Sequence, residues 1–247
     1  MRVMTIVLLL LLPASCGWQP RPGPLQPAAE TAVPTKLPPV TLTVGALMQR
    51  PEQLSGRELR LIAVVHKADP HVLSPYLIGA GEDSTVPDDP RLTLWLAEAL
   101  PVTVASGLSD DATVLRLRGR LSPPGAYGAN AKYTYQFSTD DAAVLRPEQT
   151  TIASVAANPH ALDAVLVTLN GVLLTAPEGA LLLDAVGDGG VPAADARQIK
   201  LRDLAPDQIP DSLRQSGDAR YGPVEVVGWW RDQALTPLII RQPESSP

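Results

Sequence analysis

The sequence predicts an all-β protein made of two tandem five-stranded barrels, each with a short helical segment, placed after a disordered Pro-rich linker. The 247-residue chain contains 26 prolines, which argue against long helices because proline lacks a backbone donor and clashes inside a helix. Apolar and polar residues alternate along several short segments, which is the period of a half-buried strand. The order of these segments occurs twice along the chain.

Composition excludes several classes of protein. Apolar residues make up 45% of the chain and charged residues only 19%, with a net charge of −6, so the chain is not a wholly disordered acidic polymer. The single cysteine excludes an internal disulfide framework, a structural zinc site of several thiolates and an iron–sulfur cluster. We expect no cofactor.

The first residues, MRVMTIVLLLLLPASC, predict a secretory signal peptide over residues 1–15. Arg2 supplies a positive start, and residues 6–12 form an apolar run that ends at Pro13. This run is too short to cross a bilayer, which needs about 20 residues. The only cysteine, Cys16, falls where such a signal would be cut.

Ala14, Ser15 and Cys16 resemble the lipobox of bacterial lipoproteins, in which the cysteine is lipidated. Pro13 stands where an aliphatic residue is usual, with Leu12 one place further away. The resemblance implies a protein that is exported and anchored to the outer face of a bacterial membrane by lipidated Cys16, because two acyl chains give stable anchoring. The alternative is a secreted protein with an incidental cysteine.

Residues 16–40 predict an extended tether. This segment holds few large apolar residues and seven prolines, which favour polyproline II geometry: Pro20, Pro22, Pro24, Pro27, Pro34, Pro38 and Pro39. The alternative is a Pro-rich ligand for an SH3-like domain.

A repeat organises the rest of the chain, because residues 43–65 align with residues 151–173 at an offset of 108. The identical pairs are Thr43/Thr151, Pro51/Pro159, Leu54/Leu162, Leu61/Leu169 and Val64/Val172. The same order of features follows in both halves, which indicates a tandem duplication. We therefore expect domains at 41–148 and 149–242, and a disordered tail at 243–247.

Each half begins with a helical turn, marked in the first half by Val44, Leu47 and Met48, and continues with strands. The expected strands are 59–66, 76–78, 92–96, 114–121 and 133–137 in the first half, and 165–174, 180–184, 197–201, 223–230 and 235–241 in the second. One short helix is expected within 203–217. Five strands with an insertion after the third are typical of the oligonucleotide/oligosaccharide-binding (OB) barrel.

Residues 43–146 and 151–241 resemble the small OB-fold domains of bacterial exported proteins. Their first segment runs as a short helix, a proline turn and a strand leading to Val-x-Gly; Gly171 supplies the glycine in the second half, and Ala63 replaces it in the first. The resemblance implies a fold rather than one activity, because such folds host many unrelated functions.

Aromatic residues are the candidate ligand contacts. Tyr133, Tyr135 and Phe137 share one strand face, which either packs inward or forms a stacking platform for bases or sugars. Tyr127, in the PPGAYG turn, is the better exposed candidate. Trp229 and Trp230 are adjacent on one strand, so one of them should point out of the barrel. For the outward tryptophan, an inter-domain contact is favoured over a ligand contact.

His66, Asp69 and His71, in the segment HKADPH, are possible metal ligands. The alternative is a solvated hairpin loop, since the Pro70 turn explains Asp69 without a metal. The second half has no counterpart of this segment.

The chain lacks a Gly-x-Ser-x-Gly elbow, a phosphate-binding loop and a dinucleotide fingerprint, so we assign no catalytic residue. Nucleic acid is disfavoured because the net charge is negative; Arg116, Arg118 and Arg120, on one strand face, are expected to be solvated or to pair with an acidic loop. We expect a membrane-anchored, non-enzymatic binding or scaffolding module with a protein or carbohydrate partner. The alternatives are a small-ligand or metal chaperone using His66, Asp69 and His71, and then a hydrolase.

Overall fold

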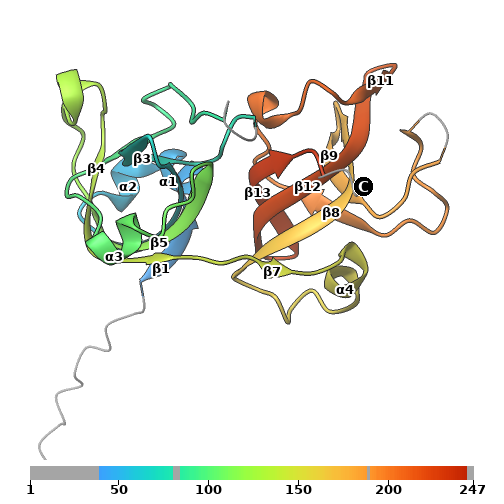
Figure 1. Cartoon of the computed structure of the whole chain (residues 1–247), viewed down its shortest axis with the longest axis horizontal. Helices are drawn as coiled ribbons and strands as arrows, with labels where there is room; N and C mark the ends of the chain where they lie inside the picture. The colour runs from blue at the N-terminus through green and yellow to red at the C-terminus, as the bar shows by residue number, and fades with distance from the viewer. Residues whose placement is uncertain (1–38, 80–83, 188–189, 244–247) are drawn as a thin grey trace, which may run out of the picture. The chain divides into compact units, whose positions relative to one another are not determined.

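The computed structural model describes residues 39–79, 84–187 and 190–243 (Figure 1). Strands account for 47% of the residues and helices for 13%, so the all-β class is confirmed. Pro38–Pro247 form one compact unit. The predicted signal peptide, the tether with Cys16 and most of the C-terminal tail lie outside the described residues.

The first half folds as a sheet that closes on itself. Its strands are β1 (Val40–Thr43), β2 (Glu58–His66), β3 (Asp69–Ser74), β4 (Leu94–Leu96), β5 (Ala112–Leu121) and β6 (Gln136–Val144). The ring order is β2-β3-β4-β6-β5, and β5 pairs back onto β2. Within the ring only β4 and β6 run parallel, and β1 lies outside it, parallel to β2. The predicted closed five-stranded barrel is therefore confirmed for the first half.

The second half repeats the same strand order. Its strands are β7 (Glu148–Gln149), β8 (Val165–Ala176), β9 (Gly179–Leu183), β10 (Gln198–Leu201), β11 (Arg214–Ser216), β12 (Ala219–Arg231) and β13 (Ala234–Arg241). The ring order is β8-β9-β10-β13-β12, and β12 pairs back onto β8. The parallel pair is again the third and fifth strands, β10 and β13, and β7 runs parallel to β8 as β1 does to β2.

The short helices explain one identity of the repeat. Helices α1 (Val44–Met48) and α4 (Ile152–Ala157) begin at equivalent places in the two halves. Thr43 Oγ1 accepts from the backbone N–H of Ala46 at 3.2 Å, and Thr151 Oγ1 accepts from that of Ser154 at 3.1 Å. Both threonines are therefore N-caps, which satisfy a donor that the first helical turn leaves unpaired. The remaining helical segments are α2 (Pro51–Leu54), α3 (Val102–Ala105), η2 (Ala129–Ala131) and η4 (Pro206–Gln208).

Two expected strands of the first barrel were wrong in detail. The second strand of the first barrel is β3, not residues 76–78, because Pro75 cannot donate to a ladder and the strand ends at Ser74. The last strand begins at Gln136 rather than Tyr133. In the second half, the one short helix expected within 203–217 is present as the 3₁₀ turn η4, which begins at Pro206 and ends before Pro210.

Strand β2 is buried on both faces. Leu59, Leu61, Ala63 and Val65 lie in the core of the first barrel, as their alternation predicts. The opposite face does not meet solvent throughout, because Ile62 and Val64 are fully buried in a third apolar cluster. That cluster also contains residues of the second barrel, including Leu166, Val227, Trp229, Leu238 and Ile239. The two barrels therefore pack against each other through outward-facing strand residues.

Gly119 allows β5 and β6 to approach at a bulge, where the pairing register shifts between Arg118 and Gly119. A Cβ atom at position 119 would lie 1.9 Å from the carbonyl oxygen of Ser138. We expect Gly119→Ala to lower the free energy of unfolding by about 2 kcal/mol or more, measured by urea denaturation. Gly45→Ala is the control, since its nearest contact would be an ordinary 3.5 Å and its effect should stay within about 1 kcal/mol. Equal effects of the two substitutions would contradict the proposed steric cause.

Candidate functional site

Three aromatic rings from different elements form a row on the first barrel, and we call His71, Trp95 and Tyr133 the aromatic row. The ring centroids of His71 and Trp95 lie 5.0 Å apart with an interplanar angle of 14°, and those of Trp95 and Tyr133 lie 5.4 Å apart at 33°. Trp95 points away from the barrel core because its neighbours Leu94 and Leu96 belong to that core. Strand pairing thus assembles rings that are distant in the sequence.

A glycine turn holds the aromatic row in place. Gly128 has a φ of +72°, and a Cβ atom there would lie 2.7 Å from Trp95 Cδ2 and 2.8 Å from Tyr133 Cδ2. The backbone therefore packs directly against two rings, in a conformation that favours glycine. Tyr127 and Tyr133 exchange backbone hydrogen bonds of 2.9 and 3.1 Å, which fix this turn to the segment before β6.

Burial divides the aromatic side chains in and beside the row into two groups. His71, Trp95 and Tyr127 are half-buried, so part of each side chain meets solvent. The Tyr127 hydroxyl donates to the carbonyl of Pro123 at 2.8 Å. Tyr135 belongs to the core of the first barrel together with Phe137, so its ring is a packing residue and not a ligand contact. Tyr133 is also buried and contributes to the row mainly by supporting Trp95.

A charged pair borders the aromatic row. Lys132 Nζ lies 5.6 Å from the centroid of the Tyr133 ring, within the range of a cation–π contact, and forms an ion pair with Asp88. The hydrogen bond with Asp88 raises the pKa of Lys132 above its usual range. Burial raises the pKa of the Tyr133 hydroxyl. The row is therefore flanked by both a donor and an acceptor group.

The predicted metal ligands are not assembled into a site. His66 Nδ1 accepts from the backbone N–H of Ala68 at 3.2 Å, whereas the His71 ring stacks on Trp95 and its Nδ1 lies 3.3 Å from the Leu96 carbonyl oxygen. Across the described ranges, no three His, Cys, Asp or Glu side chains lie close enough together to hold a metal ion. The expectation of a metal set at His66, Asp69 and His71 is corrected, since stacking takes His71 into the aromatic row.

Trp229 is a contact between the barrels. It is 7% exposed and belongs to the cluster that joins them, which agrees with the favoured sequence interpretation and removes it from the candidate ligand contacts. Its indole Nε1 is buried without a hydrogen-bond partner among the described residues. Trp230 points into the second barrel, and its Nε1 donates to the carbonyl of Pro159 at 2.7 Å.

The row of arginines on β5 is exposed, as the sequence predicts. Arg118 pairs with Glu58 on the neighbouring strand, with Nε 2.8 Å from Oε1. Of the described carboxylates in the acidic loop, Asp88 pairs with Lys132 and Asp89 with Arg91.

Sequence reasoning missed Trp95, the central ring. The available signal was its outward position between two core leucines of one short strand. In the second barrel, β10 also places two buried apolar residues on either side of a less buried one, and the middle residue there is the exposed Lys200. The outward position on the third strand of a barrel therefore does not require an aromatic residue.

No protein-family model, no curated protein and no solved structure matches this chain. None of the helices in the described ranges is both long and apolar enough to cross a bilayer. The functional assignment therefore depends on the geometry and chemistry of the barrels themselves.

The two neighbouring tryptophans allow a matched comparison of a buried indole N–H that has a hydrogen-bond partner with one that has none among the described residues. Trp230→Phe removes the indole N–H that donates to the Pro159 carbonyl. Trp229→Phe removes an indole N–H that is buried without a partner among the described residues. We expect Trp230→Phe to lower the free energy of unfolding by about 1 kcal/mol or more beyond Trp229→Phe, because only the former loses a hydrogen bond. Urea denaturation measures both. A larger loss for Trp229→Phe would show that its indole N–H is satisfied.

Proposed function

We propose that this protein is an exported, lipid-anchored envelope protein whose two barrels act as a non-enzymatic binding or scaffolding module. The observation that carries the proposal is the aromatic row, with half-buried His71 and Trp95. The partner we favour is a carbohydrate, and a protein partner is the alternative.

The aromatic row suits binding because its rings are held before a ligand arrives. Stacking, the Gly128 turn and strand pairing fix the rings, so a partner would cost little side-chain entropy on association. Aromatic rings combine a large apolar contact area with specific geometry. The ion pair of Lys132 and Asp88 can exchange hydrogen bonds with sugar hydroxyls at the edge of the row.

Binding is favoured over catalysis by the groups that the row presents. A nucleophilic mechanism needs a nucleophile activated by a base within hydrogen-bond reach. The row instead presents stacked rings beside one ion pair, and His71 is engaged with Trp95 and the Leu96 carbonyl. The net charge of −6 disfavours a nucleic acid partner, whose phosphates require basic surface.

The row is tested by titrating the full chain with neutral oligosaccharides of hexose and of N-acetylhexosamine, using calorimetry. We expect Trp95→Ala to weaken binding about fivefold or more, because a packed aromatic contact is removed. Lys200→Ala, at the matching exposed position of the second barrel, should leave the affinity unchanged. Binding that survives Trp95→Ala would show that sugars bind elsewhere, and no binding to the wild type would contradict the carbohydrate partner.

The anchor is tested by metabolic labelling with a palmitate analogue in bacteria that express the full chain. We expect label on the wild type in the membrane fraction and none on Cys16→Ser, because the chain has no other cysteine. An unlabelled wild-type protein would contradict the lipid anchor. It would not affect the proposed role of the aromatic row, which the sugar titration tests separately.

A further inference from the structure

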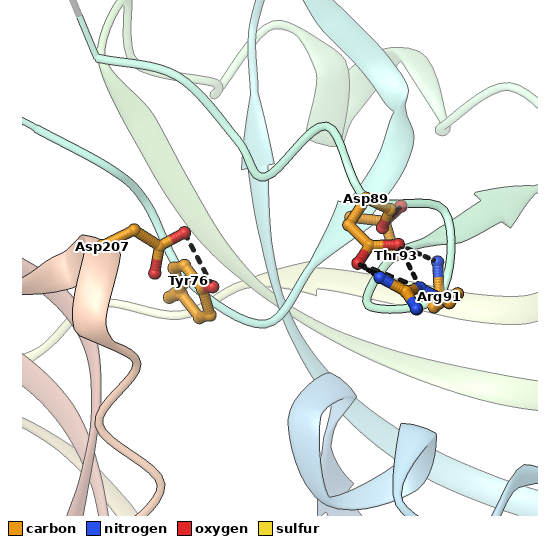
Figure 2. A network of polar contacts seen from close by, with 5 residues as sticks. All are labelled: Tyr76, Asp89, Arg91, Thr93 and Asp207. Carbon is orange, nitrogen blue, oxygen red and sulfur yellow. Dashed lines mark hydrogen bonds and ion pairs between the residues drawn. The ribbon is translucent and has the colours of Figure 1, made fainter.

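A hydrogen bond joins the two barrels at the edge of a crevice. Tyr76, in the segment after β3, donates its hydroxyl proton to Asp207 Oδ2 in η4 at 3.0 Å (Figure 2). Two hollows, of about 590 and 610 Å³, meet at Asp207, which lines both of them. Each volume is within the range of sites that hold small molecules, and such sites often lie between domains.

The walls of the 590 Å³ hollow are mainly apolar and come from both barrels. Its apolar side chains are Met48, Pro75 and Leu92 from the first barrel and Leu204, Ala205, Pro206 and Pro237 from the second. The ring of Tyr76 also lines the hollow and is only 6% exposed as a residue. An occupant therefore needs an apolar body.

The charged residues that line the 590 Å³ hollow are of one sign. Asp203 and Asp207 line the 590 Å³ hollow, and no Lys or Arg is among the described residues that line it. Asp211 joins Asp207 in the 610 Å³ hollow, but it is paired with Arg220 at 3.6 Å, and the cation Arg241 there is paired with Glu225, its Nε 2.7 Å from Oε1. A positive group on the occupant would be attracted, and a negative group would be repelled.

Tyr76 prepares the Asp207 carboxylate to receive that positive group. Burial and the hydrogen bond to Asp207 raise the pKa of Tyr76 well above its usual range, so the hydroxyl stays protonated and donates. It engages Oδ2, while Oδ1 of Asp207 has no hydrogen-bond partner among the described residues. The Asp203 carboxylate accepts a hydrogen bond from the side-chain amide of Gln49 at 3.4 Å. Because this amide is uncharged, it does not neutralise the charge of Asp203.

The loop before β4 adds no cation to this site. Arg91 lies in the same view but is held by Asp89, whose two carboxylate oxygens accept from its guanidinium at 2.8–3.1 Å (Figure 2). Thr93 further fixes this turn by donating to the Asp89 carbonyl oxygen at 3.1 Å.

We propose that the inter-barrel crevice is a binding site for an amphipathic amine, with its apolar body in the 590 Å³ hollow and its ammonium group on Asp207. The Tyr76 ring offers a face for a cation–π contact with the same head group. This site is distinct from the aromatic row and does not depend on the function proposed for it.

The test uses three ligands with one tail and different head charges: octylammonium, 1-octanol and octanoate, titrated by calorimetry into the full chain below their aggregation concentrations. We expect octylammonium to bind about tenfold or more tightly than octanol, because a charge-assisted hydrogen bond to a carboxylate is added. Octanoate should bind most weakly. Equal affinities, or no binding of octylammonium, would overturn the proposal.

Asp207→Asn locates the site, since the amide keeps an acceptor for the Tyr76 hydroxyl and removes the charge. We expect this variant to lose the preference for octylammonium over octanol while octanol binding stays unchanged. Asp195→Asn is the matched control: it removes the same charge from an exposed carboxylate that lines neither hollow. Asp203→Asn, in the same hollow, gives a second reading if Asp207→Asn lowers the thermal stability. A preference that persists in both crevice variants would overturn the proposal, and Trp95→Ala should not affect it.

Discussion

Burial of β2 on both faces is the constraint on which the rest of this structure depends. One set of alternating residues fills the first barrel, while Ile62 and Val64 on the other face pack against the second barrel. Separating the barrels would expose these residues together with Leu166 and Trp229, all of them apolar and buried. Because exposure of apolar surface is unfavourable, the barrels behave as one compact unit, consistent with the single unit formed by Pro38–Pro247.

The same constraint explains where the two barrels are free to differ. The third strands, β4 and β10, each place two apolar residues in their own core, and neither strand takes part in the cluster between the barrels. Packing fixes the flanking positions, but it leaves the outward position open, and that position is Trp95 in one barrel and Lys200 in the other. The repeated fold therefore carries a surface that is not repeated.

Local sequence patterns predicted most of the architecture, because the signals are local. Alternation identified the long strands, and Thr43 and Thr151 mark helix starts by hydrogen bonds within three residues. The features that sequence reasoning missed depend on contacts distant in the chain. Alternation shows that Ile62 leaves its own core but does not name its partner, and the hydrogen bond of Tyr76 joins residues 131 positions apart. The expected metal site at His66, Asp69 and His71 is not formed for the same reason, because the His71 ring stacks on Trp95, 24 positions away in the sequence.

The inter-barrel crevice follows from how the two barrels meet. Apolar strand residues pack closely in the joining cluster, whereas the segments that leave the strands, after β3 and after β10, carry prolines, which cannot donate to a strand ladder. The segment after β3 makes one backbone hydrogen bond to the second barrel, from the N–H of Leu77 to the carbonyl of Leu238 at 2.9 Å, and a side-chain contact joins it to the segment after β10. Tyr76 and Asp207 make this contact with one hydrogen bond, which leaves hollows beside it instead of a continuous core. A site between the barrels is thus a consequence of joining two closed sheets through their outer faces.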